Sequence, residues 1–177
     1  FPSAETCKSC HPVHFKEWSV SPHAYAQLSP IANAMQAEIN KRTHGTNADF
    51  CIRCHTPVGM ALSEPAMMAN LDRHATSLEG VTCIVCHRRP HANGKVSARY
   101  ALLEGDLTET VFGPNGNEEL DRVINSGDFD VTTAMDPSGR MIHKEAQTRP
   151  QITSAATCGS CHDVNHITGF RLEEAFS

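Results

Sequence analysis

Residues 83–87 read Cys-Ile-Val-Cys-His, and residues 7–11, 51–55 and 158–162 repeat this spacing. These four pentapeptides contain all eight cysteines of the chain. Cysteines three positions apart lie on the same side of one helical turn. A histidine follows the second cysteine each time. We therefore expect the chain to fold around this fourfold repeat.

The pattern Cys-x-x-Cys-His is the attachment signature of c-type haem. Its two sulfurs can bond the two vinyl groups on one porphyrin edge, and its histidine can bind the iron as the proximal ligand. We expect four covalently bound haem c groups. The predicted thioether residues are Cys7, Cys10, Cys51, Cys54, Cys83, Cys86, Cys158 and Cys161. The predicted proximal iron ligands are His11, His55, His87 and His162.

Paired cysteines have other uses. Zinc sites and thioredoxin-like redox pairs also contain Cys-x-x-Cys, but neither requires a histidine directly after it. A disulfide framework requires an even number of cysteines and not this local spacing. Covalent haem is favoured because it explains every fixed residue of the repeat.

Composition indicates a thin protein core. The 177 residues fit one domain, 1–177, in which the motif-free residues 88–157 form a flap. Aromatic residues are only 6%, and ten prolines and eleven glycines interrupt the chain. We expect a mainly α fold with much irregular structure, in which short helices and loops wrap four haems. At most a small β-hairpin is expected near 95–112, where apolar residues alternate.

Charge and hydropathy bear on partners and location. The formal net charge of −5 argues against nucleic acid and anionic membrane surfaces. No apolar run is long enough to span a membrane. The chain begins at Phe1, as expected after removal of a secretory signal. Since c-type haem is attached outside the cytoplasmic membrane, we expect an exported protein, periplasmic or extracellular. Its expected partners are redox proteins or an extracellular electron acceptor.

One longer helix is predicted between the first two motifs. Ser29 and Pro30 suit its cap and first turn. Its predicted apolar stripe consists of Ile31, Ala34, Met35 and Ile39.

Distal iron ligands must come from outside the motifs. The remaining histidines are His14, His23, His44, His74, His91, His143 and His166. A second imidazole on each iron would use four of them, which favours bis-histidine ligation. Methionine is the competing ligand, but Met67 and Met68 lie on a predicted helical stripe and are more typical of a core.

Several stretches resemble a known family. Residues 10–26, "CHPVHFKEWSVSPHAYA", are similar to the opening of multihaem cytochromes related to the tetrahaem electron carrier of nitrifiers. Residues 49–59, 79–87 and 143–166 also resemble segments of that family. The resemblance implies that His23 and His143 are distal ligands. In size and motif count the chain is also similar to tetrahaem subunits of extracellular cytochrome filaments, or nanowires.

The other histidines are either further ligand candidates or surface residues. His166 lies four residues past His162, from where it cannot reach its own haem and would serve a neighbouring one. His44 and His91 compete for the remaining place. We interpret His14 and His74 as surface residues.

The sequence therefore predicts electron transfer, with no catalytic residue. Three versions stay open: a filament in which a neighbouring subunit receives His44 or His166, a soluble periplasmic carrier, and a multihaem reductase with one open haem. Arg88, Arg89 and Lys95 could surround an open iron, but they are better explained as solvated or paired with haem propionates.

Overall fold

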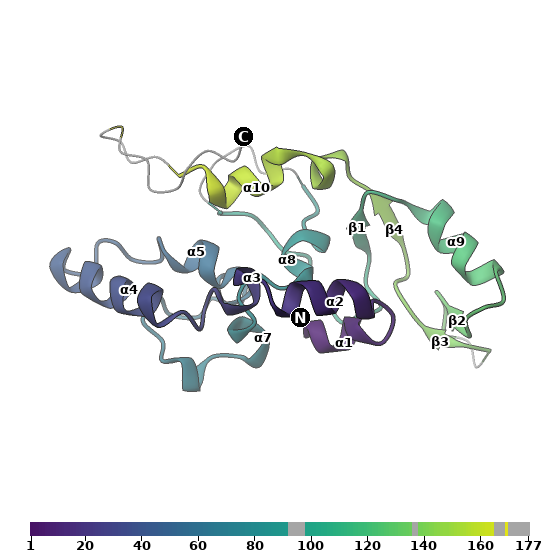
Figure 1. The fold of residues 1–177 in the computed structure, drawn as a ribbon, viewed down its shortest axis with the longest axis horizontal. Helices are drawn as coiled ribbons and strands as arrows, with labels where there is room; N and C mark the ends of the chain where they lie inside the picture. Colours follow the sequence, from purple (N-terminus) through teal and green to yellow (C-terminus); the bar gives the residue numbers. More distant parts are fainter. Residues whose placement is uncertain (92–97, 136–137, 165–168, 170–177) are drawn as a thin grey trace.

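The computed structural model describes residues 1–91, 98–135, 138–164 and 169. Short helices joined by loops dominate it, which confirms the predicted fold class (Figure 1). The helix α4 lies at one end of the molecule and α9 at the other, with α8 between them. None of the described helices is long and apolar enough to span a membrane.

The N-terminal part consists of four helices: α1 (Ala4–Lys8), α2 (Pro12–Ser19), α3 (Pro22–Tyr25) and α4 (Pro30–Arg42). The last three begin at a proline, whose missing N–H would have no intrahelical partner there. Ser29 accepts a hydrogen bond from the Ala32 amide at 3.3 Å, which confirms the predicted start of α4.

The buried face of α4 differs from the predicted apolar stripe. Ile31 and Met35 are exposed, whereas Gln36 and Asn40 are buried. The polar face turns inward because its amides find partners: Gln36 Nε2 donates to the Ala48 carbonyl oxygen at 3.1 Å. A buried amide with a hydrogen bond costs far less than one without.

The middle of the chain forms five short elements: α5 (Ile52–His55), α6 (Pro57–Ala61), the 3-10 helix η1 (Asn70–Asp72), α7 (Ala75–Leu78) and α8 (Cys83–His87). The predicted helical stripe through Met67 and Met68 is wrong, because both residues lie in a loop. Ser63, just before this stretch, has a positive φ of 58°, which lies outside the right-handed helical region.

The remaining elements are β1 (Val111–Gly113), α9 (Asn117–Asn125), β2 (Val131–Thr132), β3 (Arg140–Met141), β4 (Ala146–Thr148), η2 (Pro150–Thr153) and α10 (Ala155–His162). Both sheets are two-stranded and parallel. Val111 pairs with Ala146 where β1 meets β4, and Val131 pairs with Arg140 where β2 meets β3.

No hairpin forms in the described part of 95–112, of which residues 95–97 lie outside the described ranges. The chain is irregular from 98 to 110, and β1 pairs with β4 instead. Ala98 has a φ of 48°, which interrupts an extended run. Its amide donates to the Ser160 carbonyl at 3.0 Å, and the Leu103 amide donates to the Arg88 carbonyl at 2.7 Å. These two amides thus donate to carbonyls of α10 and of the end of α8, and not to a neighbouring strand.

The hydrophobic core of the described residues is small. Its buried cluster consists of Val58, Ile84, Val85 and Leu102, with Phe1, Ala61, Val81 and Tyr100 packed against it. It lies where α6 and α8 meet the irregular stretch that contains Leu102. Large apolar side chains remain exposed elsewhere, including Val13 and Val20 on the first helices.

Candidate haem-binding sites

Each Cys-x-x-Cys-His motif closes one helical turn. The amides of Cys10 and His11 donate to the Cys7 carbonyl at 3.2 and 2.9 Å. The same two bonds close the turn at 51–55, with lengths of 3.3 and 3.2 Å. The third motif is α8 itself, and the fourth forms the last turns of α10. Both sulfurs of a motif are therefore presented from one side of a turn, as attachment to one porphyrin edge requires.

Two motif histidines are held in the tautomer that binds a metal. His55 Nδ1 lies 2.8 Å from the Ala26 carbonyl oxygen, and His87 Nδ1 lies 2.8 Å from the Phe112 carbonyl oxygen. A carbonyl only accepts, so each Nδ1 must carry the proton. The lone pair is then on Nε2, which is free for iron. Metal-binding histidines are commonly oriented by this kind of bond.

His143 shows the same arrangement outside the motifs. Its Nδ1 donates to the Leu107 carbonyl oxygen at 2.8 Å. Burial lowers the pKa of His143, the bond to Leu107 opposes this, and the nearby His11, Arg88 and His87 lower the pKa further. His143 is therefore a neutral imidazole with a free Nε2, close to the histidines of both the first and third motifs.

His23 lies against the fourth motif. The centroids of the His23 and His162 rings are 6.1 Å apart, with the planes tilted by 58°. Two imidazoles that bind one iron from opposite sides have centroids about 6 Å apart, because each metal–nitrogen bond is about 2 Å. Burial and the neighbouring His162 lower the pKa of His23, which favours the neutral ligand form.

A similar separation elsewhere has a different cause. The rings of His11 and His14 lie 6.2 Å apart, but these residues are three positions apart at the start of α2. Neighbours on one helical turn cannot bind an iron from opposite sides. His14 is exposed and lies 3.6 Å from Glu17, as expected of a surface residue.

The other histidines lie at segment ends. His74 is the N-cap of α7, where its Nδ1 accepts from the Thr76 amide at 3.2 Å. His44 is exposed just after α4, with a φ of 51°, and His91 is exposed after α8. His166, the remaining candidate, lies outside the described residues.

Glu79 joins the first and third motifs. The Ala4 amide and the Thr82 hydroxyl both donate to Glu79 Oε2 at 2.9 Å, and the Ser3 hydroxyl donates to Oε1. These bonds tie the start of α1 to the start of α8.

The thiols of Cys7 and Cys83 are consequently in hydrogen-bonding contact. That bond raises the pKa of Cys7 and lowers the pKa of Cys83 to about 7. Thioether formation would replace both thiol protons.

The second and fourth motifs form another pair. A hydrogen bond with Cys54 is the main cause that lowers the pKa of Cys161 to about 7. Arg89 Nη1 donates to the Ser160 hydroxyl at 3.3 Å, and Tyr100 lies beside the same cysteine. Cysteine contacts thus join the first motif to the third and the second to the fourth, and Cys86 of the third motif also lies near Cys158 and Cys161 of the fourth. The sequence analysis did not predict this pairing.

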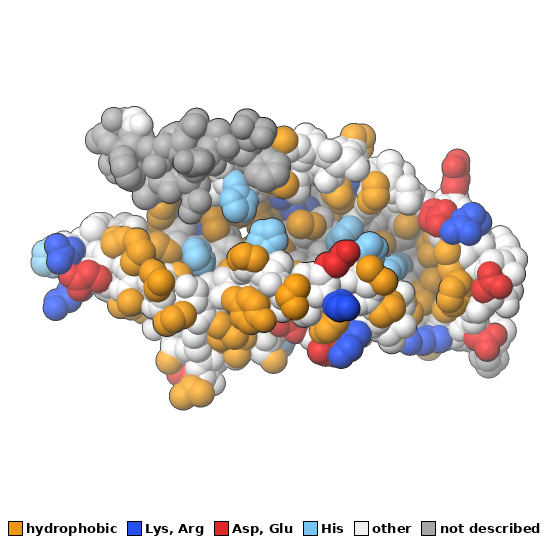
Figure 2. Space-filling model, in the orientation of Figure 1, with side chains coloured by type: hydrophobic (Ala, Val, Ile, Leu, Met, Phe, Trp, Pro, Cys, Tyr) orange, Lys and Arg blue, Asp and Glu red, His pale blue; other side chains and the backbone are white. Residues whose placement is uncertain are grey.

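Histidines gather on one face. Figure 2 shows pale blue side chains along the middle of the molecule, where the surface is hollowed between the N-terminal helices and the segments above them. The histidines His11, His23, His87 and His162 are partly exposed, and three of them end a motif. Imidazoles that face a hollow fit a bulky group inserted between the segments.

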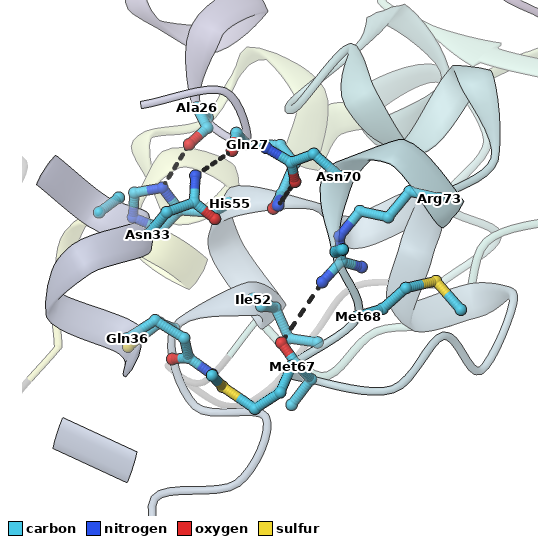
Figure 3. A pocket seen from close by; sticks show the side chains of 14 residues that line it. Ala26, Gln27, Asn33, Gln36, Ile52, His55, Met67, Met68, Asn70 and Arg73 are labelled. Carbon is cyan, nitrogen blue, oxygen red and sulfur yellow. Dashed lines mark hydrogen bonds between the residues drawn. The ribbon is translucent and has the colours of Figure 1, made fainter. Parts of the chain in front are cut away.

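A pocket of about 260 Å³ lies against the second motif (Figure 3). Cys51, Ile52 and His55 line one side of it, and residues from α4 and the 66–73 segment line the other. The Met67 sulfur accepts from Asn40 Nδ2 at 3.3 Å, so it is held by α4. Among the described lining residues, His55 is the single histidine.

The sequence analysis missed this pocket. The available signal was the spacing of Asn33, Gln36 and Asn40, which places three amides on one face of α4. Behind the pocket, a buried ion pair joins Arg73 and Glu64 at 2.8 Å.

The donor chemistry therefore fits haem c. None of the eight cysteines forms a disulfide, and the described residues include no group of three or more metal-binding side chains close enough to hold an ion directly. Each motif instead offers two sulfurs and one imidazole on a single turn.

Comparisons with known proteins found one family match and a similar solved structure. Residues 6–88, slightly under half of the chain, match the family described as Cytochrome c554 and c-prime. The fold is similar to that of a penta-heme cytochrome c552 from Thermochromatium tepidum, with a TM-score of 0.59 and 21% identity. The match covers 97% of this chain and 48% of the other, so this chain spans about half the length of that protein. No curated protein matches the chain.

Proposed function

We propose that this chain is a tetrahaem c-type cytochrome that transfers electrons outside the cytoplasm. The observation that carries the proposal is the anchored imidazole at the end of a Cys-x-x-Cys turn, at His55 and His87, in a chain with four such turns. Haem c, when bound, supplies an iron that takes up and releases one electron.

The protein residues have three roles in this proposal. The eight motif cysteines hold the porphyrins, and His11, His55, His87 and His162 bind the irons. The carbonyls of Ala26 and Phe112 fix the orientation of two of these rings by accepting from Nδ1. The two pairs of motifs keep the attachment sites in contact, and short distances are what electron transfer between cofactors requires.

The distal ligands follow from the ring positions. His23 is proposed for the iron of the fourth motif, because its ring centroid lies 6.1 Å from that of His162. His143 is proposed for the first or third motif, since it lies near His11 and His87. His166, His44 and His91 remain candidates for the other positions.

The test is the number and the redox behaviour of the haems. The intact mass of the extracted protein should exceed that of the polypeptide by four haems. The visible spectrum should change reversibly on stepwise reduction and reoxidation without a substrate. A mass increase of fewer than four haems would show that a motif is vacant.

In an extracellular form of this function, the subunits would polymerise into a filament that carries electrons along its haems. His44 is exposed just after α4, and α4 lies at one end of the molecule (Figure 1). A histidine there could bind an iron of the next subunit, and such a head-to-tail contact propagates without closing. His166 is the other candidate. Electron microscopy of the native protein tests this: filaments that His44→Ala abolishes support it, and monodisperse particles contradict it.

A reductase with one open haem is the second candidate function. The pocket against His55 favours it, because His55 is the only histidine among its described lining residues and Met67 is held by α4. An iron bound there by His55 alone would have a free position facing polar side chains. Binding of one equivalent of carbon monoxide by the unmodified reduced protein would support this function, and the absence of binding would exclude it.

A further inference from the structure

Two consecutive arginines directly after the third motif are buried. Arg88 is 1% exposed and Arg89 is 9% exposed. Arginine is among the residues that are rarely buried unless paired. Its guanidinium stays protonated in proteins, so both side chains carry a full positive charge.

Arg88 extends toward the first and third motifs. Its Nη2 donates to the Asp106 carbonyl oxygen, while its Nε and Nη1 have no hydrogen-bond partner in the described part of the chain. Its charge acts on the Cys7 thiol and on His143, which places it beside both motifs.

The neighbouring acidic residues neutralise Arg88 only in part. Glu109 forms an ion pair with Lys144, and the Asp106 carboxylate accepts from the Thr108 amide at 2.8 Å. No ion pair between described residues includes Arg88 or Arg89. Arg88 is therefore a buried cation without a dedicated counter-ion among the described residues.

Arg89 extends in the other direction. Its Nη1 donates to the Ser160 hydroxyl at 3.3 Å, inside the fourth motif. Its guanidinium lies 4.0 Å from the centroid of the Tyr100 ring, a cation–π contact. Its charge acts on both Cys86 and Cys161. The two arginines thus place one cation beside the first and third motifs and another beside the third and fourth.

We infer that Arg88 and Arg89 are buried cations that raise the reduction potentials of the haems, Arg88 at the first and third motifs and Arg89 at the third and fourth. This inference rests on the proposed haem function. A ferric haem carries one more positive charge than a ferrous haem, so a nearby cation disfavours oxidation. The effect is strong where burial lowers the local dielectric, and net charge and burial are established determinants of such potentials.

A purely structural role would have a different signature. If the arginines only fill space and bind backbone groups, their replacement would change stability but not the potentials of haems that remain correctly bound. Lysine retains the charge with different shape, and glutamine removes the charge. The two substitutions therefore separate charge from packing.

The experiment is a spectroelectrochemical titration of the complete holoprotein and its variants. In Arg88→Gln and Arg89→Gln, the oxidised-to-reduced ratio of the affected haems at a fixed applied potential should rise about tenfold, equivalent to about 59 mV for one electron. Arg88→Lys and Arg89→Lys should stay near the unmodified protein. Arg122→Gln is the matched control, because Arg122 is exposed and paired with Glu119 on α9.

The outcomes separate the inference from the proposed function. Four haems with unchanged potentials in both glutamine variants would overturn the inference and leave the function standing. A potential drop in the lysine variants equal to that in the glutamine variants would also overturn it. Fewer than four haems in the unmodified protein would count against the function itself. If Arg88→Gln loses haem, Arg89→Gln decides, because the Arg89 side chain contacts the fourth motif, which Arg88 does not.

Discussion

The imidazole rings of His23 and His162 lie with their centroids 6.1 Å apart, although the residues come from opposite ends of the described chain. The segment that carries His23 is fixed against the lead-in to α8. The Val81 amide donates to the His23 carbonyl at 3.0 Å, and Trp18 Nε1 donates to the Val81 carbonyl at 2.9 Å. Gly80 permits this contact, because it has a φ of 64° and a Cβ there would lie 2.5 Å from the His23 oxygen.

Replacement of His23 by alanine should open one iron. If His23 and His162 bind the same iron, the reduced His23→Ala variant will bind one equivalent of carbon monoxide more than the unmodified protein does. The control is His14→Ala, since His14 is exposed on α2 and should leave the spectrum unchanged. Equal carbon monoxide binding by His23→Ala and the unmodified protein would rule out His23 as a ligand.

Removal of the second attachment site should affect the fourth. In a Cys51→Ser, Cys54→Ser variant, the intact mass should fall by one haem. Because Cys54 and Cys161 are in contact, the paramagnetic NMR signals of the haem at the fourth motif should shift. Signals assigned to the first motif should shift much less. The reverse pattern of shifts would contradict the pairing described above.

Stability should depend on haem attachment. The described core cluster contains four buried apolar residues, which is little to offset the conformational entropy lost on ordering the chain. Expression without the haem-attachment machinery should give an unfolded or degraded polypeptide. Circular dichroism of the apoprotein measures this against the holoprotein, and native-like helical content without haem would disprove the dependence.

Asp49 should contribute stability that depends on pH. Its carboxylate accepts from Arg53 at 2.6 and 3.0 Å and from Arg99 at 2.9 and 3.1 Å. Burial acts to raise the Asp49 pKa, but the bond and charge of Arg53 and the charge of Arg99 outweigh it, so the pKa is lowered. The ion pair between Asp49 and Arg99 joins the segment just before the second motif to the irregular stretch that begins at residue 98. Asp49→Asn should therefore cost up to about 1 kcal/mol near pH 7.

The sign of the pH dependence follows from the lowered pKa. The stabilisation is fully present above the unfolded-state pKa and is lost as pH falls through the lower folded-state pKa. The free energies of unfolding of the Asp49→Asn variant and the unmodified protein, measured by denaturant titration, should thus converge in acid. Glu119→Gln is the control, because its ion pair on α9 is exposed and should matter little at any pH. A difference in unfolding free energy between the Asp49→Asn variant and the unmodified protein that stays constant with pH would refute the role of the carboxylate.

Local features of this protein were accessible from the sequence. The motif turns depend on contacts between residues three and four positions apart, such as the bond from the His11 amide to the Cys7 carbonyl. The cap at Ser29 likewise depends on its own helix. The mainly α class with irregular loops followed from short motifs, many prolines and glycines, and few aromatic residues. Neighbours along the chain decide all of these.

Only the tertiary structure decided how the motifs and histidines come together. The first motif meets the third through Glu79, and His23 meets His162 through the contact of its own backbone with Val81. The polar face of α4 turns inward because amides on that face find distant partners, which a hydrophobic pattern does not register. These contacts join residues far apart in the chain. The spacing of residues along the chain does not encode these contacts, since any of several histidines outside the motifs could serve as the distal ligand of a given iron.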